Sequence, residues 1–411
     1  MNFMNSNHNL ESSKPVKAET EPNLFDQIGE LGYETDILGA LDKELRQHGF
    51  GGSTDIPKLV YLSAYTALFD DPVSLLIKGP SGSGKSYALH AGLRYLPQEA
   101  YVEFHGMSEK ALAYAGELDL RHKVLVIQEA AGRAEGNGMV FLRQLLTEGG
   151  LSYLTVAQTP QGHVGKELPS VKGPVGLFMT TTANRIHHED ETRMLSFHVD
   201  QSREQIRAAL KAQANGGPKK PSEESLKRWH ALYRFVQEDG LDVRIPFWDK
   251  LIDLLPDTHP RVLRDVPKVR SLTSAHALLH RQQRGHPVTA NLEDFKAVYD
   301  LVAGPLSHGL QRSVPVHIQE TVNAVEKLQV MGKTPISNTN IADFLGRDSG
   351  TVSRNLHEAI NQGYVVNDNP GKGRESRLRL GNRKIVSDGF LPTPEELERH
   401  LRNPGRILPV S

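Results

Sequence analysis

Residues 79–86 read Gly79-Pro80-Ser81-Gly82-Ser83-Gly84-Lys85-Ser86 and match the spacing G-x-x-x-x-G-K-[ST] at every fixed position. The apolar run at 73–77 has the length of a buried strand, and 87–96 has the pattern of a helix. A strand, a glycine-rich loop and a helix in this order form the context in which such a loop binds phosphate. The sequence therefore predicts an α/β domain built on a phosphate-binding loop.

Each residue type in this loop has a chemical role. Glycines let backbone N–H groups converge on phosphate oxygens, and the N-terminus of the following helix adds positive charge. Lys85 is expected to neutralise the β- and γ-phosphates, and Ser86 to ligate Mg²⁺. The expected cofactors are therefore ATP and Mg²⁺.

A second strand followed by polar residues is expected at 124–129, where the sequence is Val-Leu-Val-Ile-Gln-Glu. Gln128 stands where an acidic residue is usual, and it can bind a magnesium-held water without bringing charge. Glu129 is the candidate general base that polarises the attacking water. The alternative is that Glu129 only caps the next helix.

A third apolar run, at 175–179, leads into Thr-Thr-Thr-Ala-Asn-Arg, and further helices are expected at 24–48, 56–69, 226–235 and 269–284. A polar residue at the end of this strand can hold the lytic water; Asn184 is the first choice and Thr182 the second.

Arg193, in the run 191–197, is the candidate for an arginine that crosses a subunit boundary. Its rivals are Arg185 and Arg203, and each could instead be an ordinary surface arginine.

The loop, the Gln128-Glu129 pair, the Thr-Ala-Asn strand end and the arginine before Leu-Ser-Phe resemble AAA+ ATPases in their order. The chain most resembles the helicases that are similar to mini-chromosome-maintenance proteins, especially the short versions encoded by mobile elements beside primases. The resemblance covers about 56–284 and again the C-terminal region. It implies that Asn184 is sensor 1 and Arg193 the arginine finger. It also implies that Arg270, in a run that opens a lid helix at Val269, is sensor 2, with Arg264 as the alternative. The large N-terminal DNA-binding domain of the cellular helicases has no counterpart before residue 56.

Residues 151–156, 158–163 and 171–179 are expected to form a hairpin before the sensor strand. The resemblance implies that this hairpin lines the pore of a ring and grips single-stranded DNA. Lys166 and Lys172 are the charged candidates, with His163 near the tip. The alternative is a surface hairpin with solvated lysines.

Residues 314–384 have the order of a winged helix-turn-helix: helices at 318–331, from 334 and at 349–362, then a β-hairpin. Arg354 lies on the outward side of the third helix. Residues 370–384 carry six Lys or Arg against Glu375, a charge of 6 − 1 = +5, which suits phosphate contacts. The predicted duplex-DNA contacts are Arg354, Lys372, Arg374, Arg377 and Arg379. Protein–protein contact is the alternative use of such a domain.

The composition is that of a globular protein: 411 residues, 38% hydrophobic, 24% charged and a net charge of −1. The absence of cysteine excludes disulfides and thiolate metal sites. No apolar run is long enough to cross a membrane, and a cytoplasmic location is expected. We expect a disordered leader at 1–22, an AAA+ core with N-terminal helices at 23–205 and a helical lid and linker at 206–310. The winged helix-turn-helix would follow at 314–384 and a tail, with a short helix after 394, at 385–411.

Three functions fit these features. The first is an ATP-driven ring, a homo-hexamer that translocates on or unwinds DNA in the replication of a mobile genetic element. The second is an ATP-dependent switch, such as an initiator, a helicase loader or a transposition regulator, that assembles on DNA without unwinding it. The third is a defence or transcription-linked ATPase whose winged helix holds a protein partner. A primase or another replication protein is a possible partner of the first two.

Overall fold

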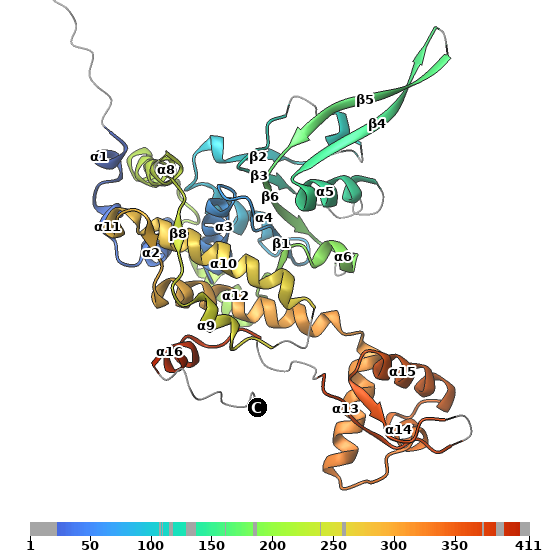
Figure 1. The fold of residues 1–411 in the computed structure, drawn as a ribbon. Helices are drawn as coiled ribbons and strands as arrows, with labels where there is room; N and C mark the ends of the chain where they lie inside the picture. Colours follow the sequence, from blue (N-terminus) through green and yellow to red (C-terminus); the bar gives the residue numbers. More distant parts are fainter. Residues whose placement is uncertain are drawn as a thin grey trace, which may run out of the picture.

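The computed structural model describes residues 23–106, 108, 110–114, 118–128, 137–160, 162–183, 187–238, 240–256, 260–371, 374–383 and 390–402. Figure 1 shows a body of helices around one sheet, a long hairpin that extends from it, and a C-terminal group of helices set to one side. In this described part no helix is both long and apolar enough to cross a membrane.

A five-stranded sheet forms the centre of the body, in the order β2-β3-β6-β1-β7. All four pairings of neighbouring strands are parallel. The strands are β1 (Leu75–Lys78), β2 (Tyr101–Phe104), β3 (Lys123–Ile127), β6 (Val175–Thr181) and β7 (Leu195–His198). Because β6 pairs with both β1 and β3, the carboxyl ends of these three strands lie side by side at one edge of the sheet.

Both faces of the sheet are buried, as a parallel sheet requires. Alternate residues of the strands enter two different hydrophobic clusters: Val124 and Val126 pack on the side of α3 (Asp55–Thr66) and α4 (Lys85–Leu93). Leu125 and Ile127 pack on the side of α5 (Asn137–Glu148). The continuous apolar runs of the sequence follow from this double burial.

Helices before and after the sheet share one continuous hydrophobic core with it. T-shaped ring contacts join α3 to α8, between Tyr61 and Trp229 and between Tyr65 and Tyr233. The expected lid therefore packs directly on the nucleotide-binding core. The elements concerned are α1 (Leu24–Ile28), η1 (Gly29–Tyr33), α2 (Ile37–Gln47), α7 (Arg203–Ala214), α8 (Glu223–Glu238), β8 (Val243–Arg244), α9 (Trp248–Ile252), α10 (Val262–Leu279), α11 (Arg281–Arg284), β9 (Val288–Thr289) and α12 (Leu292–Ser313).

Two helix predictions need correction. The helix expected over 24–48 is interrupted, because Gly29 adopts φ +57° and ends α1. The helix expected over 269–284 begins at Val262 and ends at Leu279, and α11 follows as a separate short helix. Pro267 is tolerated near the N-terminal end of α10, where it removes one backbone hydrogen bond. Arg270 is therefore in the body of a helix and not at its start.

A hairpin is present where one was predicted, but its second strand covers 162–172 and not 171–179, because 175–181 forms the separate sheet strand β6. The hairpin consists of β4 (Gly150–Thr159) and β5 (Gly162–Lys172), paired antiparallel. Leu151 and Val171 are buried at its base, whereas the Leu154 and Val156 side chains farther out are 70% and 68% exposed. The hairpin therefore leaves the body with apolar side chains facing solvent. The short elements η2 (Gln98–Ala100), η3 (Leu112–Tyr114) and α6 (His188–Glu191) complete this part of the chain.

The C-terminal group of helices has its own hydrophobic core. It contains α13 (Val316–Val330), α14 (Asn338–Leu345), α15 (Ser349–Asn361), and the antiparallel pair β10 (Val365–Asn367) and β11 (Leu378–Leu380). Ser337 and Asn340 form a capping box at the start of α14, and Asp348 caps α15. Gly346, at φ +61°, makes the turn between these two helices.

The chain then returns to the main body. The helix expected after residue 394 is α16 (Pro394–Arg402), which packs against α9 and α12. Phe390, Leu391 and Leu397 are buried in the main hydrophobic core. The described part of the C-terminal segment therefore packs against the main body.

Because α3 and α4 pack closely at Gly92, we predict that one added methyl group there destabilises the fold. A Cβ at Gly92 would lie 2.5 Å from the Pro57 carbonyl oxygen and 2.8 Å from the Val60 Cβ. We expect Gly92→Ala to lower the free energy of unfolding by about 1–3 kcal/mol through overpacking, measured by urea denaturation. Gly304→Ala is the control, since Gly304 in α12 has open space around it and should gain roughly 0.5–1 kcal/mol. Equal stabilities of the two variants would contradict this packing.

Candidate functional site

The glycine-rich loop lies between the end of β1 and the start of α4. Gly82 and Gly84 adopt φ +75° and +86°, a left-handed conformation that favours glycine. Gly84 is also the N-cap of α4, so the free N–H groups of the first helical turn follow the loop directly. Loop and helix together form an anion-binding site of the kind expected.

Lys85 and Ser83 supply two further observations that fit a bound phosphate. Lys85 is buried, and its Nζ donates a hydrogen bond of 2.7 Å to the Pro80 carbonyl oxygen, across the loop. The Ser83 Oγ is buried without a hydrogen-bond partner in the part of the chain that the structure describes. Ser86, the expected Mg²⁺ ligand, is half-buried on the first turn of α4. The donor set of the loop therefore suits a nucleotide with its metal.

Gln128 follows β3 and is held by two side chains that the sequence analysis did not single out. Its Nε2 donates to the Glu103 Oε1 at 2.5 Å and lies 2.7 Å from the His90 Nε2. Glu103 belongs to β2 and His90 to α4. Glu129, the candidate general base, lies outside the described residues.

The end of β6 adjoins the start of the loop. The Gly79 N–H donates to the Thr181 carbonyl oxygen at 3.2 Å, and the Ala183 N–H donates to the Thr181 Oγ1 at 3.0 Å. Thr182, the second choice for sensor 1, is half-buried here. Asn184 and Arg185 lie outside the described residues. The strand chosen for sensor 1 is thus a direct neighbour of the phosphate-binding loop.

A group of charged residues surrounds α6. Lys78, at the end of β1, pairs with Glu191 across 2.6 Å. Arg193 pairs with Glu189 across 3.2 Å and also donates to the Thr147 hydroxyl. Arg193 is thus tied within its own chain, whereas its rival Arg203 is exposed at the start of α7.

The first half of α10 lies against the segment that follows α6. The Arg264 Nη1 donates to the Thr192 Oγ1 at 2.7 Å, and the Lys268 Nζ to the Thr192 carbonyl oxygen at 3.0 Å. Burial lowers the pKa of Lys268, although Asp265 acts in the opposite direction. The Arg270 guanidinium instead lies 5.9 Å from the centre of the Trp248 ring. Of the two sensor 2 candidates, Arg264 is the one that contacts the region after the sensor strand.

The candidate DNA contacts are exposed, but they differ in their partners. On the hairpin, Lys166 lies opposite Thr155, and Lys172 lies opposite Gly150 at the base. His163 lies opposite Gln158, next to the tip. In the C-terminal group, Arg354 contacts the Thr351 hydroxyl within α15, and Arg379 pairs with Asp368 across 2.9 Å. Arg374 and Arg377 are exposed, and Lys372 lies outside the described residues.

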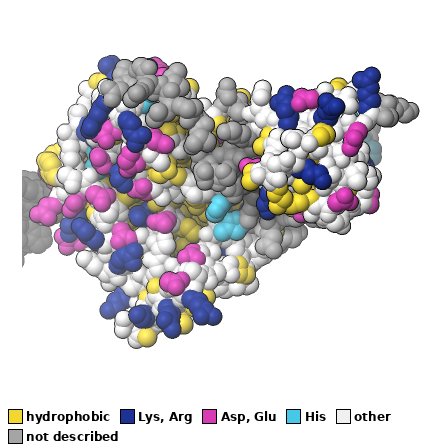
Figure 2. Space-filling model, turned by 90° about the horizontal axis from the view of Figure 1, so that it is seen from below, with side chains coloured by type: hydrophobic (Ala, Val, Ile, Leu, Met, Phe, Trp, Pro, Cys, Tyr) yellow, Lys and Arg dark blue, Asp and Glu magenta, His cyan; other side chains and the backbone are white. Residues whose placement is uncertain are grey.

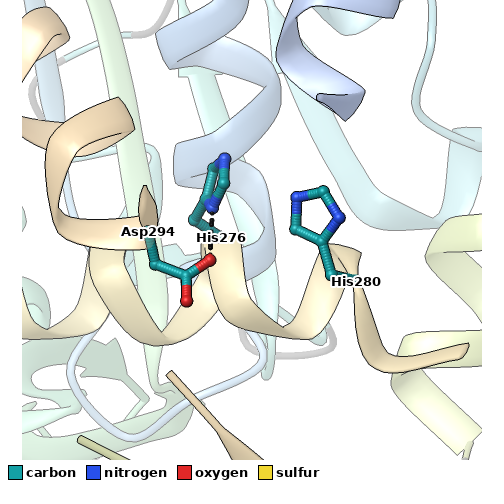
Figure 3. Close-up of side chains that lie close together, drawn as sticks. All are labelled: His276, His280 and Asp294. Carbon is teal, nitrogen blue, oxygen red and sulfur yellow. Dashed lines mark hydrogen bonds and ion pairs between the residues drawn. The ribbon is translucent and has the colours of Figure 1, made fainter. Parts of the chain in front are cut away.

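A second polar cluster lies between α10 and α12 and was not predicted. His276 on α10 and His280, the residue between α10 and α11, lie near Asp294 on α12, and all three are buried (Figure 3). The spacing H-x-x-x-H is the signal that could have found it. The Asp294 carboxylate already accepts from the His276 Nδ1 at 2.7 Å, the Arg284 Nη1 at 2.5 Å and the Asn291 N–H at 2.7 Å. Because these donors satisfy the carboxylate and one of them is a guanidinium, we assign the cluster a structural role, joining α10 to α12.

Comparison with known proteins gave one match to a family model. Residues 51–239, a little under half of the chain, match the model described as the MTBMA_p00010 P-loop domain. A comparison with curated proteins found no match. The matched stretch contains β1, the glycine-rich loop, α4 and the other four strands of the sheet. The matched stretch is similar to a P-loop domain, and this match, with the loop geometry, supports nucleotide binding; such domains generally bind a nucleotide with Mg²⁺.

Because His280 is buried, we predict that the free energy of unfolding falls at acidic pH. Burial, and then the neighbouring His276 and Arg284, lower the pKa of His280 from 6.5 to about 4. The unfolded chain therefore takes up the proton first, and this part of the stability is present above pH 6.5 and is lost as the pH falls towards 4. We expect His280→Gln to reduce the loss of unfolding free energy between pH 7 and pH 4.5 by about 2–3 kcal/mol. His163→Gln, at the exposed hairpin, is the control; parallel pH profiles for all three proteins would refute the assignment.

Proposed function

We propose that this chain is an ATP-hydrolysing, ring-forming DNA motor, a helicase or translocase that serves the replication of a mobile genetic element. One observation carries the proposal: the long hairpin is inserted between β3 and β6, the two strands that lead to Gln128 and to the expected sensor. A change in the nucleotide would move the ends of these strands. The hairpin between them would then transmit that movement to DNA.

The chemistry of the proposed motor uses the residues around the loop. Lys85 would exchange the Pro80 carbonyl oxygen for the β- and γ-phosphate oxygens of ATP. Bound Mg²⁺, held by Ser86 and by a water on Gln128, would neutralise phosphate charge. Glu129 would accept the proton of the attacking water, and Asn184 would orient that water.

The ring would place a nucleotide at each boundary between subunits of a homo-hexamer. Arg193 would then leave Glu189 and stabilise transition-state charge on the nucleotide of the next subunit. Sensor 2 would come from α10. Arg264 is better placed for this than Arg270, because it already contacts Thr192.

Single-stranded DNA would contact the exposed half of the hairpin. Lys166 and His163 lie towards the tip and can meet the phosphate backbone, while Lys172 lies at the base. The exposed Leu154 and Val156 side chains can pack against bases or sugars. Because Lys166 lies opposite Thr155, it projects from one face of the hairpin, whereas Leu154, Val156 and His163 project from the other. A strand held without sequence preference would therefore contact both faces, with phosphates near Lys166 and bases or sugars near Leu154 and Val156.

Duplex DNA would bind at the C-terminal group of helices, which we interpret as a winged helix-turn-helix. The pair α14 and α15, joined by a short turn at Gly346, is followed by the hairpin β10–β11. In such domains the second helix of the pair enters the major groove and the wing contacts phosphates. Figure 2 shows Lys and Arg side chains on this side of the molecule. Arg354 would lie at the groove, with Lys372, Arg374 and Arg377 on the wing.

A second function is an ATP-dependent switch that assembles on DNA without unwinding it, as a replication initiator, a helicase loader or a transposition regulator does. The neutral Gln128 favours this function, because a weaker magnesium site slows turnover. A primase or another replication protein would be the partner in either case.

The two functions differ in their response to DNA. We expect single-stranded DNA to raise the ATPase rate of the native chain at least severalfold, and Glu129→Gln to abolish that rate while ATP still binds. Lys85→Ala is the control, since it should lose binding as well. If hydrolysis is slow and its rate changes neither with single-stranded DNA nor with Glu129→Gln, the motor function is excluded and the ATP-dependent switch remains.

If the wing contacts DNA phosphates, its arginines contribute to the salt dependence of duplex-DNA binding. Each phosphate contact contributes about 0.9 to the slope of log K against log salt concentration. Arg374→Ala combined with Arg377→Ala should therefore lower that slope by about 1.8 in duplex-DNA binding, measured by fluorescence anisotropy. Arg347→Ala is the matched control, because Arg347 pairs with Glu320 at 2.8 Å in the same group of helices. An unchanged slope in the double variant would show that the wing does not bind DNA.

A further inference from the structure

Glu103 places a carboxylate beside Gln128, the position at which the sequence lacks one. We propose that Glu103 and His90 are positioning residues that hold the Gln128 carboxamide in one orientation, so that its carbonyl oxygen accepts a hydrogen bond from magnesium-bound water. Glu103 would then supply the negative charge that Gln128 itself does not carry. This inference rests on the proposed function, and it names residues of that site which motif spacing cannot reveal.

The hydrogen atoms that each side chain carries determine which atoms of this cluster donate and which accept. The Gln128 Nε2 carries two N–H groups and can only donate. One goes to the Glu103 Oε1 at 2.5 Å, so that oxygen is an acceptor. The other is directed to the His90 Nε2 at 2.7 Å, so that ring nitrogen must be unprotonated, with the proton on Nδ1. The reverse orientation of the amide would set its oxygen against the Glu103 carboxylate, which is unfavourable. The two partners therefore select one orientation.

This orientation leaves the carbonyl oxygen as the hydrogen-bonding atom that Gln128 can offer to a ligand. A carboxamide is planar, and its oxygen lies on the other side of the group from its nitrogen. Glu103 pairs in register with Val126, so Gln128, two residues farther, projects from the same face of the sheet. That face is covered by α4, which carries His90.

The helix α4 connects this cluster to the expected metal ligand. Ser86 and His90 are four residues apart on α4, so they lie on the same side of the helix, one turn from each other. Because His90 contacts Gln128, the side of α4 that carries Ser86 is turned towards the end of β3. Ser86 and the Gln128 carbonyl oxygen can therefore serve one magnesium ion, the first directly and the second through water.

The experiment measures how strongly magnesium tightens nucleotide binding. The affinity for a fluorescent ATP analogue is titrated with MgCl₂ and, separately, in EDTA. We expect Glu103→Gln to raise the magnesium concentration needed for half-maximal binding by about tenfold, the lower end of the effect of ligand-orienting partners. Binding in EDTA should not change. Glu99→Gln is the control, since Glu99 lies just before the same strand but pairs with Arg234.

A charge swap separates this role from a merely structural one. Glu103→Gln combined with Gln128→Asp reverses the donor and the acceptor, so the magnesium response should return to at least the native level. If Glu103→Gln does not fold, the double variant alone is the test. A magnesium dependence of nucleotide binding that is weaker in the double variant than in the native chain overturns the inference. A response of Glu103→Gln equal to that of Glu99→Gln also overturns it, while the proposed function stands. A native chain that binds no ATP under either condition overturns both.

Discussion

The hydrogen bonding of β6 between β1 and β3 is the constraint on which the nucleotide site depends. It places the glycine-rich loop, Gln128 and the end of the sensor strand at one edge of the sheet, although about a hundred residues separate the first from the last. The bond from the Gly79 N–H to the Thr181 carbonyl oxygen extends this pairing into the loop itself. The backbone at the start of the loop is therefore hydrogen-bonded directly to the end of β6.

Packing extends these connections beyond the sheet. The helices after residue 205 share the hydrophobic core of the N-terminal helices, and Arg264 and Lys268 of α10 hold Thr192, next to Glu191. Glu191 in turn pairs with Lys78, the residue before the loop. Polar contacts therefore link the residue before the loop to Glu191, and the neighbouring Thr192 to α10. Such contacts are the physical means by which a bound phosphate can bias the position of a helix.

Two polar clusters, a buried one around Asp294 and a half-buried one around Gln128, differ in how fully their groups are hydrogen-bonded. The Asp294 carboxylate accepts three donors, and the cluster around it joins two helices. Burial alone acts to raise the pKa of Asp294, but the hydrogen bonds from His276 and Arg284 hold it below its usual value. Among the described residues, Glu103 and His90 contact the nitrogen of the Gln128 carboxamide and no partner of its oxygen is found. A fully satisfied group stabilises a fold, whereas a partly satisfied one can accept a ligand.

The sequence by itself determined the phosphate-binding loop, the strands before and after it, the hairpin and the order of helices and strands in the C-terminal group. These are local features, set by the spacing of glycines and the period of apolar residues. Only the tertiary structure decided that β6 lies between β1 and β3, that Arg264 rather than Arg270 contacts Thr192, and that Glu103 and His90 meet at Gln128. The reason is that strand order, and the side of a helix that packs inward, depend on contacts between residues far apart in the chain, for which local spacing carries no signal.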